Sequence, residues 1–148
     1  MSTFGSYTRE QLREAYSDAW RKQLAAAPLS PLEAMLADVI GLHPEYQPIV
    51  QDSERALGLD PGAGADNPFL HMGLHMAVRE QLSIDRPPGV RQLQLELAAR
   101  LGDAHRAEHV LMESLAETLW EAQRAGRPPD EVRYLALARH RAAGGTAT

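Results

Sequence analysis

The sequence contains no cysteine, only one lysine and few aromatic residues, and each shortage argues against a class of site. Without cysteine the chain forms no disulfide, no thiolate zinc site and no cysteine nucleophile. Lys22 is the only lysine, and the arginines are interspersed with carboxylates in a chain of net charge −5. The sequence therefore offers no basic stripe for a phosphate backbone, and we expect no nucleic-acid binding. Aromatic residues make up 5% of the chain, which disfavours a haem pocket between paired histidines.

Long apolar runs and a secretory leader are also missing. No stretch approaches the ~18 apolar residues that a membrane-spanning helix needs. The opening MSTFGSYTREQLREAY has no basic segment followed by an apolar one, as a secretory signal would. We therefore expect no membrane association and a cytoplasmic protein. Its 148 residues are enough for one domain with a sizeable core.

Helix start and stop signals recur along the chain, and no segment alternates at period two for long enough to predict a strand. Thr8 with Gln11, and Ser30 with Glu33, have the spacing of capping boxes. These signals and the apolar periodicity predict helices over 9–27, 31–43, 68–84, 90–101, 104–125 and 127–141. The fold class is predicted to be all-α.

The predicted architecture is a single-domain bundle of about five to six helices covering residues 1–148, with frayed tails at 1–7 and 142–148. Pro48 is expected to break the segment after the second helix into short helical pieces. Glycine and aspartate at turn positions predict a loop over 60–67.

A weak internal repeat links two parts of the chain. Each copy has a helix with a His-x-x-x-His pair, an Arg-Pro-Pro turn and a shorter helix; the turns are residues 86–88 and 127–129. Two helical hairpins related by a pseudo-twofold axis would bring the histidine pairs together. The alternative is that Pro-Pro is a common helix-start device that recurs by chance.

The two histidine pairs carry most of the functional information. His71 with His75, and His105 with His109, account for four of the six histidines, and each pair lies on an apolar helix face. An i, i+4 pair can chelate one ion, because the side chains sit about 5–6 Å apart. Two such helices packed side by side offer four imidazoles to one metal site, as helical bundles do in their cores. We therefore predict that these two helices pack directly against each other.

Carboxylates lie near the second pair. Glu113 continues the line of His105 and His109 and is a further candidate metal ligand. HRAEH also matches the inverted zincin pattern, in which Glu108 would act as a base beside a metal-bound water. The downstream glutamate ligand of those peptidases is missing, so peptidase activity is not predicted. Imidazole with some carboxylate suits zinc, iron, manganese or copper.

Other interpretations of the pairs stay open. Hydrogen bonds between histidine and glutamate across helices would satisfy buried imidazoles without metal, and a surface placement would need no partner. The rival function is a non-enzymatic interaction or homodimerisation protein, because methionine suits adaptable apolar contacts. Its contact surface would be formed by Trp20, Trp120, Met72, Met76 and Met112, although these methionines could equally fill gaps in the core. No substrate is indicated.

Several longer phrases resemble a known family. TREQLREAYSDAWRK, PLSPLEAMLADVIGLHPEYQPIV, NPFLHMGLHMAVREQLSIDRPPGVR and LAARLGDAHRAEHVLMESLAETLWEAQRAGRPPD occur in this order. From about residue 8 to 141, the chain resembles the bacterial family catalogued as domain of unknown function 1841. The resemblance implies a small soluble bacterial protein and no particular reaction. It also implies that HPEYQ is one of the family's characteristic phrases, which adds His43 and Glu45 to the candidate residues. Glu33 is a candidate as well, although its position favours a capping role.

Overall fold

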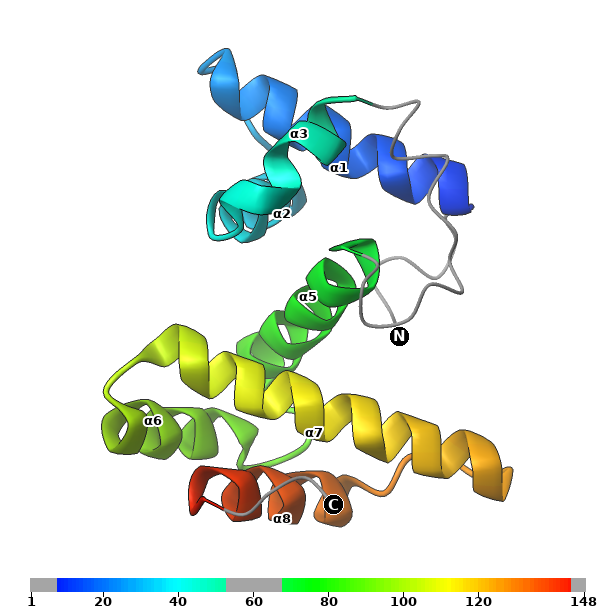
Figure 1. Cartoon of the computed structure of the whole chain (residues 1–148), viewed down its shortest axis with the longest axis vertical. Coiled ribbons are helices and arrows are strands. Elements are labelled where there is room, and N and C mark those ends of the chain that lie inside the picture. The colour runs from blue at the N-terminus through cyan, green and yellow to red at the C-terminus, as the bar shows by residue number, and fades with distance from the viewer. Residues whose placement is uncertain (1–7, 53–67, 145–148) are drawn as a thin grey trace. The chain divides into compact units, whose positions relative to one another are not determined.

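The computed structural model describes residues 8–52 and 68–144, and every regular element in these ranges is helical (Figure 1). The elements are α1 (Arg9–Leu24), α2 (Pro31–Gly41), the 3-10 turn η1 (Pro44–Tyr46), α3 (Gln47–Gln51), α5 (Pro68–Ile84), α6 (Val90–Leu101), α7 (Ala104–Ala125) and α8 (Glu131–Ala142). The all-α prediction is confirmed. The loop predicted over 60–67 lies outside the described residues.

The chain divides into two compact units, Met1–Met76 and Ala77–Thr148, and each is described by itself. α1, α2, η1, α3 and residues 68–76 of α5 belong to the first unit. Residues 77–84 of α5, α6, α7 and α8 belong to the second. The single domain expected from the sequence stays a prediction.

Side-chain caps start the first two helices as the sequence predicts. Thr8 accepts from the backbone of Gln11, and the Gln11 side chain accepts from the backbone of Thr8. Ser30 and Glu33 form the same reciprocal pair at the start of α2. α1 ends at Leu24, earlier than the predicted residue 27, because Ala26 adopts the left-handed φ of 55° and takes the chain out of the helix.

Two helix starts differ from the prediction. η1 and α3 are the short helical pieces predicted after the second helix, but Pro48 does not separate them; it lies in the first turn of α3, where a missing backbone N–H leaves no hydrogen bond unmade. α8 begins at Glu131 rather than near residue 127. Its N-cap is Asp130, whose side chain accepts from the backbone N–H of Arg133, so the two prolines precede the helix.

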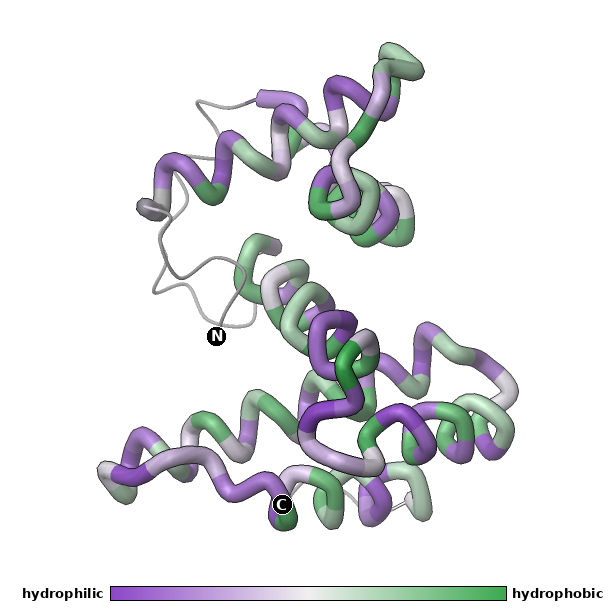
Figure 2. Tube along the Cα trace, turned by 180° about the vertical axis from the view of Figure 1, so that it is seen from behind, coloured by the Kyte–Doolittle hydropathy of each residue, from purple (hydrophilic) through white to green (hydrophobic). Residues whose placement is uncertain are grey.

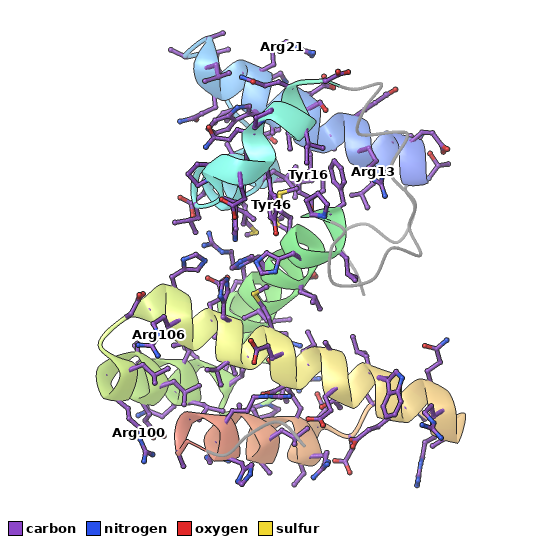
Figure 3. The ribbon with its side chains drawn as sticks, viewed as in Figure 1. Arg13, Tyr16, Arg21, Tyr46, Arg100 and Arg106 are labelled. Atoms are coloured by element: carbon purple, nitrogen blue, oxygen red, sulfur yellow. The ribbon has the colours of Figure 1, made fainter. Side chains whose placement is uncertain are left out.

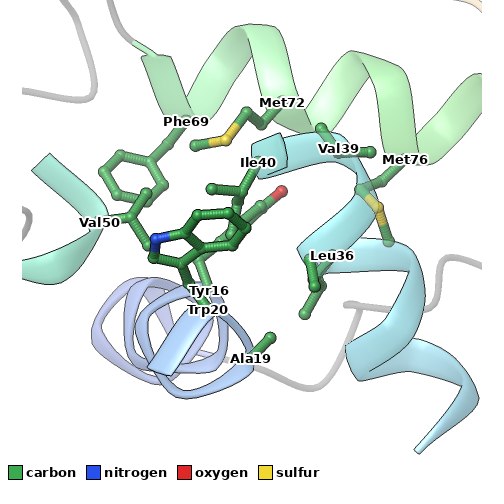
Figure 4. Close-up of a cluster of buried hydrophobic side chains, with 11 residues drawn as sticks. Tyr16, Ala19, Trp20, Leu36, Val39, Ile40, Val50, Phe69, Met72 and Met76 are labelled. Atoms are coloured by element: carbon green, nitrogen blue, oxygen red, sulfur yellow. The ribbon is translucent and has the colours of Figure 1, made fainter. Parts of the chain in front are cut away.

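The core of the first unit lies between α1, α2, α3 and residues 68–76 of α5 (Figure 4). Its buried members are Tyr16, Ala19, Trp20, Leu36, Ala37, Val39, Ile40, Val50, Phe69, Met72 and Met76. Trp20, Met72 and Met76 are therefore core residues, in line with the alternative that the methionines fill gaps in the core. Met112 is buried as well, so Trp120 (57% exposed) is the one member of the expected contact surface that is exposed.

The second unit is built around α7, which packs against α6 and α8. Hydrophobic and hydrophilic segments alternate along these helices, as expected for amphipathic packing (Figure 2). Ser114 and Thr118 are buried polar residues of α7, and each donates its hydroxyl to the carbonyl four residues earlier at 2.7 Å. Arg141 of α8 donates to the Ser114 hydroxyl at 3.1 Å. The bond from Arg141 links α8 to α7, while the two hydroxyl bonds satisfy buried polar groups within α7.

The two Arg-Pro-Pro connectors differ in local geometry. α6 starts after Gly89, which has a φ of 94° and gives no side-chain cap. α8 starts after a capping aspartate. This difference favours the interpretation of the repeat as a chance recurrence of turn residues.

Glu33 has a capping role, as expected. Its carboxylate accepts from the backbone N–H of Ser30 at 2.9 Å and from the ammonium of Lys22 at 2.5 Å. The hydrogen bond from Lys22, followed by that from the Ser30 backbone, lowers the pKa of the Glu33 carboxyl. The carboxylate thus joins the end of α1 to the start of α2.

Replacing Glu33 by glutamine should make the melting temperature less sensitive to a fall in pH. Because the folded-state pKa of Glu33 is lowered, its stabilising effect is present above the unfolded value of 4.5 and is lost as pH falls through the folded value. The melting temperature of Glu33→Gln, followed by circular dichroism, should lie below that of the wild type at neutral pH and approach it at about pH 2.5. A gap of equal size at both pH values would contradict this role for the carboxylate.

Candidate metal centre

His43 reaches the interior because it continues the buried face of α2. Leu36 and Val39 lie seven and four residues before it, and both are buried. α2 ends at Gly41, since Pro44 disfavours helical backbone in the residue before it. His43 then takes an extended φ of −128° as N-cap of η1, and its side chain is only 4% exposed.

The tautomer of His43 follows from its partner. Its Nδ1 lies 2.8 Å from the carbonyl oxygen of Val39. A carbonyl only accepts, so Nδ1 carries the proton and donates it. In the neutral ring Nε2 then carries no proton and can act only as an acceptor or a ligand. Metal-binding histidines are commonly oriented in this way by a backbone carbonyl.

Two further imidazoles lie close to Nε2 of His43. Nε2 of His71 lies 3.1 Å and Nε2 of His75 lies 3.2 Å from Nε2 of His43. His71 and His75 are one turn apart on α5, with ring centroids separated by 4.9 Å. His75 is fully buried and His71 is half-buried. We call His43, His71 and His75 the three-histidine cluster.

The separations of the His43 nitrogen from its two neighbours match those between ligands in a coordination sphere. Two nitrogens that each bind a tetrahedral zinc ion at about 2.0–2.1 Å lie about 3.3 Å apart. The two measured separations are close to that value. They also fall in the range of a nitrogen–nitrogen hydrogen bond, but the single lone pair of His43 cannot point at two donors at once.

Tyr46 covers one side of the cluster. Its ring stacks on that of His43 with centroids 5.1 Å apart and an interplanar angle of 12°, and it meets His71 edge to face at 5.9 Å. Figure 3 labels Tyr46 on the turn after α2. Burial, followed by the negative charge of Glu45, raises the pKa of the Tyr46 phenol. Glu45 itself is exposed.

The second unit holds the other predicted pair. His105 and His109 are half-buried on α7, with ring centroids 4.4 Å apart, and one ring nitrogen of each lies within 4.8 Å of the other. The pair thus has the spacing of an i, i+4 chelate. The expected meeting of this pair with His71 and His75 joins residues of both units and stays a prediction.

The two predicted carboxylates make ion pairs within the second unit. Glu108 is buried and accepts two hydrogen bonds from Arg79, at 2.8 and 3.4 Å. The side chain of Glu113 is 67% exposed and lies 3.7 Å from Arg141. Each step of four residues turns a helical side chain by about 40°, so the line from His105 reaches the surface at Glu113. Their roles as base and ligand stay predictions.

The sequence comparisons place these residues in one family. The family described as Domain of unknown function (DUF1841) matches residues 8–140. The chain belongs to this family. The matched range of the DUF1841 protein contains the three-histidine cluster, the His105–His109 pair and Tyr46. No curated protein and no solved structure gives a significant match. None of the described helices has both the length and the apolar composition needed to cross a bilayer.

Proposed function

We propose that this DUF1841 protein binds a transition-metal ion through Nε2 of His43, His71 and His75. One observation carries the proposal: a proton-free Nε2 of His43, fixed by the Val39 carbonyl, faces two further Nε2 atoms at 3.1 and 3.2 Å. A cation placed among the three atoms would accept one lone pair from each imidazole whose Nε2 is unprotonated. The fully buried position of His75 fits a neutral ligand.

The ligand chemistry narrows the choice of metal. Imidazole suits zinc, copper, nickel and iron, whereas manganese, magnesium and calcium favour oxygen ligands. The cluster offers nitrogen only, and the chain has no thiolate to add. Among the metals expected from the sequence, zinc, copper and iron therefore fit better than manganese.

The pair His105 and His109 is proposed to donate to the same ion. Its support is the chelate spacing of the two rings and their half-buried position. A sixth ligand, an oxygen of Glu113, has less support, because that carboxylate is exposed. Glu108 could act as a base beside a metal-bound water only after leaving Arg79.

The rival is a metal-free network, which the same distances would allow as hydrogen bonds. In that case one of the neighbouring imidazoles donates its proton to Nε2 of His43, and the protein serves a non-enzymatic role. Zinc would then bind no more tightly than to scattered surface histidines.

Zinc titration of the metal-free protein against a competing chelator separates the two. We expect one tight equivalent for the wild type and a loss of affinity of at least about 100-fold in His43→Gln, since even indirect ligand partners are worth 10–100-fold. His140→Gln is the matched control, because His140 is exposed on α8 and belongs to neither group. Equal affinity of His43→Gln and wild type would contradict the proposal.

The contribution of the second pair is measured in the same assay. His105→Gln with His109→Gln should weaken zinc binding while leaving one equivalent bound. An unchanged dissociation constant in this double variant would remove the pair from the site and leave the three-histidine cluster as the whole centre.

A further inference from the structure

We propose that Tyr46 is a positioning residue of the metal centre, whose ring holds the His43 imidazole in its ligand orientation and slows the release of the ion. The proposal rests on the proposed metal binding and adds a residue outside the ligand set. It is carried by the parallel stack of Tyr46 on His43 and by the edge contact of the same ring with His71.

The backbone fixes where the Tyr46 ring lies relative to His43. The two residues are the ends of one 3-10 turn, in which the Tyr46 N–H donates to the His43 carbonyl at 2.9 Å. Pro44 restricts the backbone inside this turn. α3 follows directly, and its Val50 is anchored in the core of the first unit. The phenol ring is thus attached to a short, restrained segment.

His43 needs a second restraint in addition to its hydrogen bond. The bond from Nδ1 to the Val39 carbonyl restrains one atom of the ring, but the imidazole plane can still tilt through changes in its two side-chain torsion angles. A ring stacked at 12° opposes that tilt, because tilting the imidazole would separate the two faces. The stack therefore keeps Nε2 pointed at the ion.

This arrangement affects release more than it affects the fold. His43 is the cluster member that does not lie on α5, so it is the ligand that a turn movement could withdraw. Withdrawal requires the imidazole to slide off the Tyr46 ring. Removing the ring should therefore speed dissociation of the metal.

The test measures transfer of zinc from the loaded protein to an excess of a chromogenic chelator. Tyr46→Leu should release zinc about 10–100-fold faster than the wild type, as for other residues that orient metal ligands. Tyr46→Phe keeps the stacked ring and should release zinc within about threefold of the wild-type rate. Tyr46 is half-buried, so Tyr46→Gln serves as a second ring-free variant should leucine disturb folding.

Tyr134→Leu is the matched control. Tyr134 is a buried tyrosine of the second unit, and its hydroxyl donates to Gln81 at 2.7 Å. Its loss should lower the melting temperature without changing the release rate. With cobalt in place of zinc, the visible absorption bands should shift in Tyr46→Leu and stay unchanged in Tyr134→Leu, because only the first variant alters a ligand's orientation.

The outcomes separate this inference from the proposed function. Wild-type protein that takes up no metal overturns metal binding itself. Tight binding by the wild type with equal release rates for wild type and both ring-free variants overturns only the role of Tyr46. Release from Tyr46→Phe as fast as from Tyr46→Leu would also contradict it, since the hydroxyl and not the stacked ring would then matter.

Discussion

Replacing His75 by alanine should abolish the stabilisation of the protein by zinc. At a free zinc concentration 1,000 times the dissociation constant, binding stabilises the folded wild type by about 4 kcal/mol, which is roughly 10 °C in melting temperature for a chain of this size. His75 is fully buried and its Nε2 faces Nε2 of His43 at 3.2 Å. Without it the zinc-dependent shift should fall to near zero. The measurement is thermal unfolding with and without zinc.

Each variant is compared with itself, with and without zinc, so that the effect of the mutation on the stability of the metal-free protein cancels. Met76→Ala is the matched control, because Met76 is the neighbouring buried residue of α5 but packs in the apolar core. It should lower the melting temperature by creating a cavity and still respond to zinc like the wild type. A full zinc shift in His75→Ala would show that the ion binds elsewhere.

The second large effect concerns the ion pair between Arg79 and Glu108. Replacing Glu108 alone by leucine leaves a guanidinium that is only 21% exposed without its carboxylate. Removing one partner of a buried pair costs about 3–5 kcal/mol, and the remaining exposure of Arg79 lowers our expectation to about 2–4 kcal/mol. The measurement is the free energy of unfolding in urea, followed by a spectroscopic signal of the second unit.

The double variant tests why the pair matters. Arg79→Met combined with Glu108→Leu replaces both charges by apolar side chains, and its stability should return to within about 1 kcal/mol of the wild type. If the double variant stays as unstable as the single one, the carboxylate has a role beyond balancing Arg79.

Local signals in the sequence predicted the helices well. The α7 bounds follow from Asp103 as N-cap and Gly126 at the end, and both residues act as expected. The α8 start was misplaced, because Pro128 and Pro129 suit a first helical turn equally well and only the capping bond of Asp130 decides. Such choices depend on one hydrogen bond, which composition does not reveal.

The candidate site was predicted in part. The spacing of His71 and His75 predicted two neighbouring ligands, because an i, i+4 pair is a property of one helix. His43 was only a candidate without a role, because its approach to α5 depends on how α2 packs in the core. The sequence did contain a signal for its burial, because His43 follows the apolar residues Leu36 and Val39 at helical spacing on one face of α2. Glu113 lies where a line of i+4 steps has drifted from the buried face to the surface after two turns, and its role as a ligand stays a prediction.

The metal content of the purified protein tests the central claim most directly. The protein should be produced in medium supplemented with zinc, iron and copper, passed through a desalting column and analysed for elements. Metal binding by the three-histidine cluster predicts about one equivalent of a single transition metal in the wild type and in His140→Gln, and little in His43→Gln. Wild-type protein free of metal, or equal metal in wild type and His43→Gln, would contradict it.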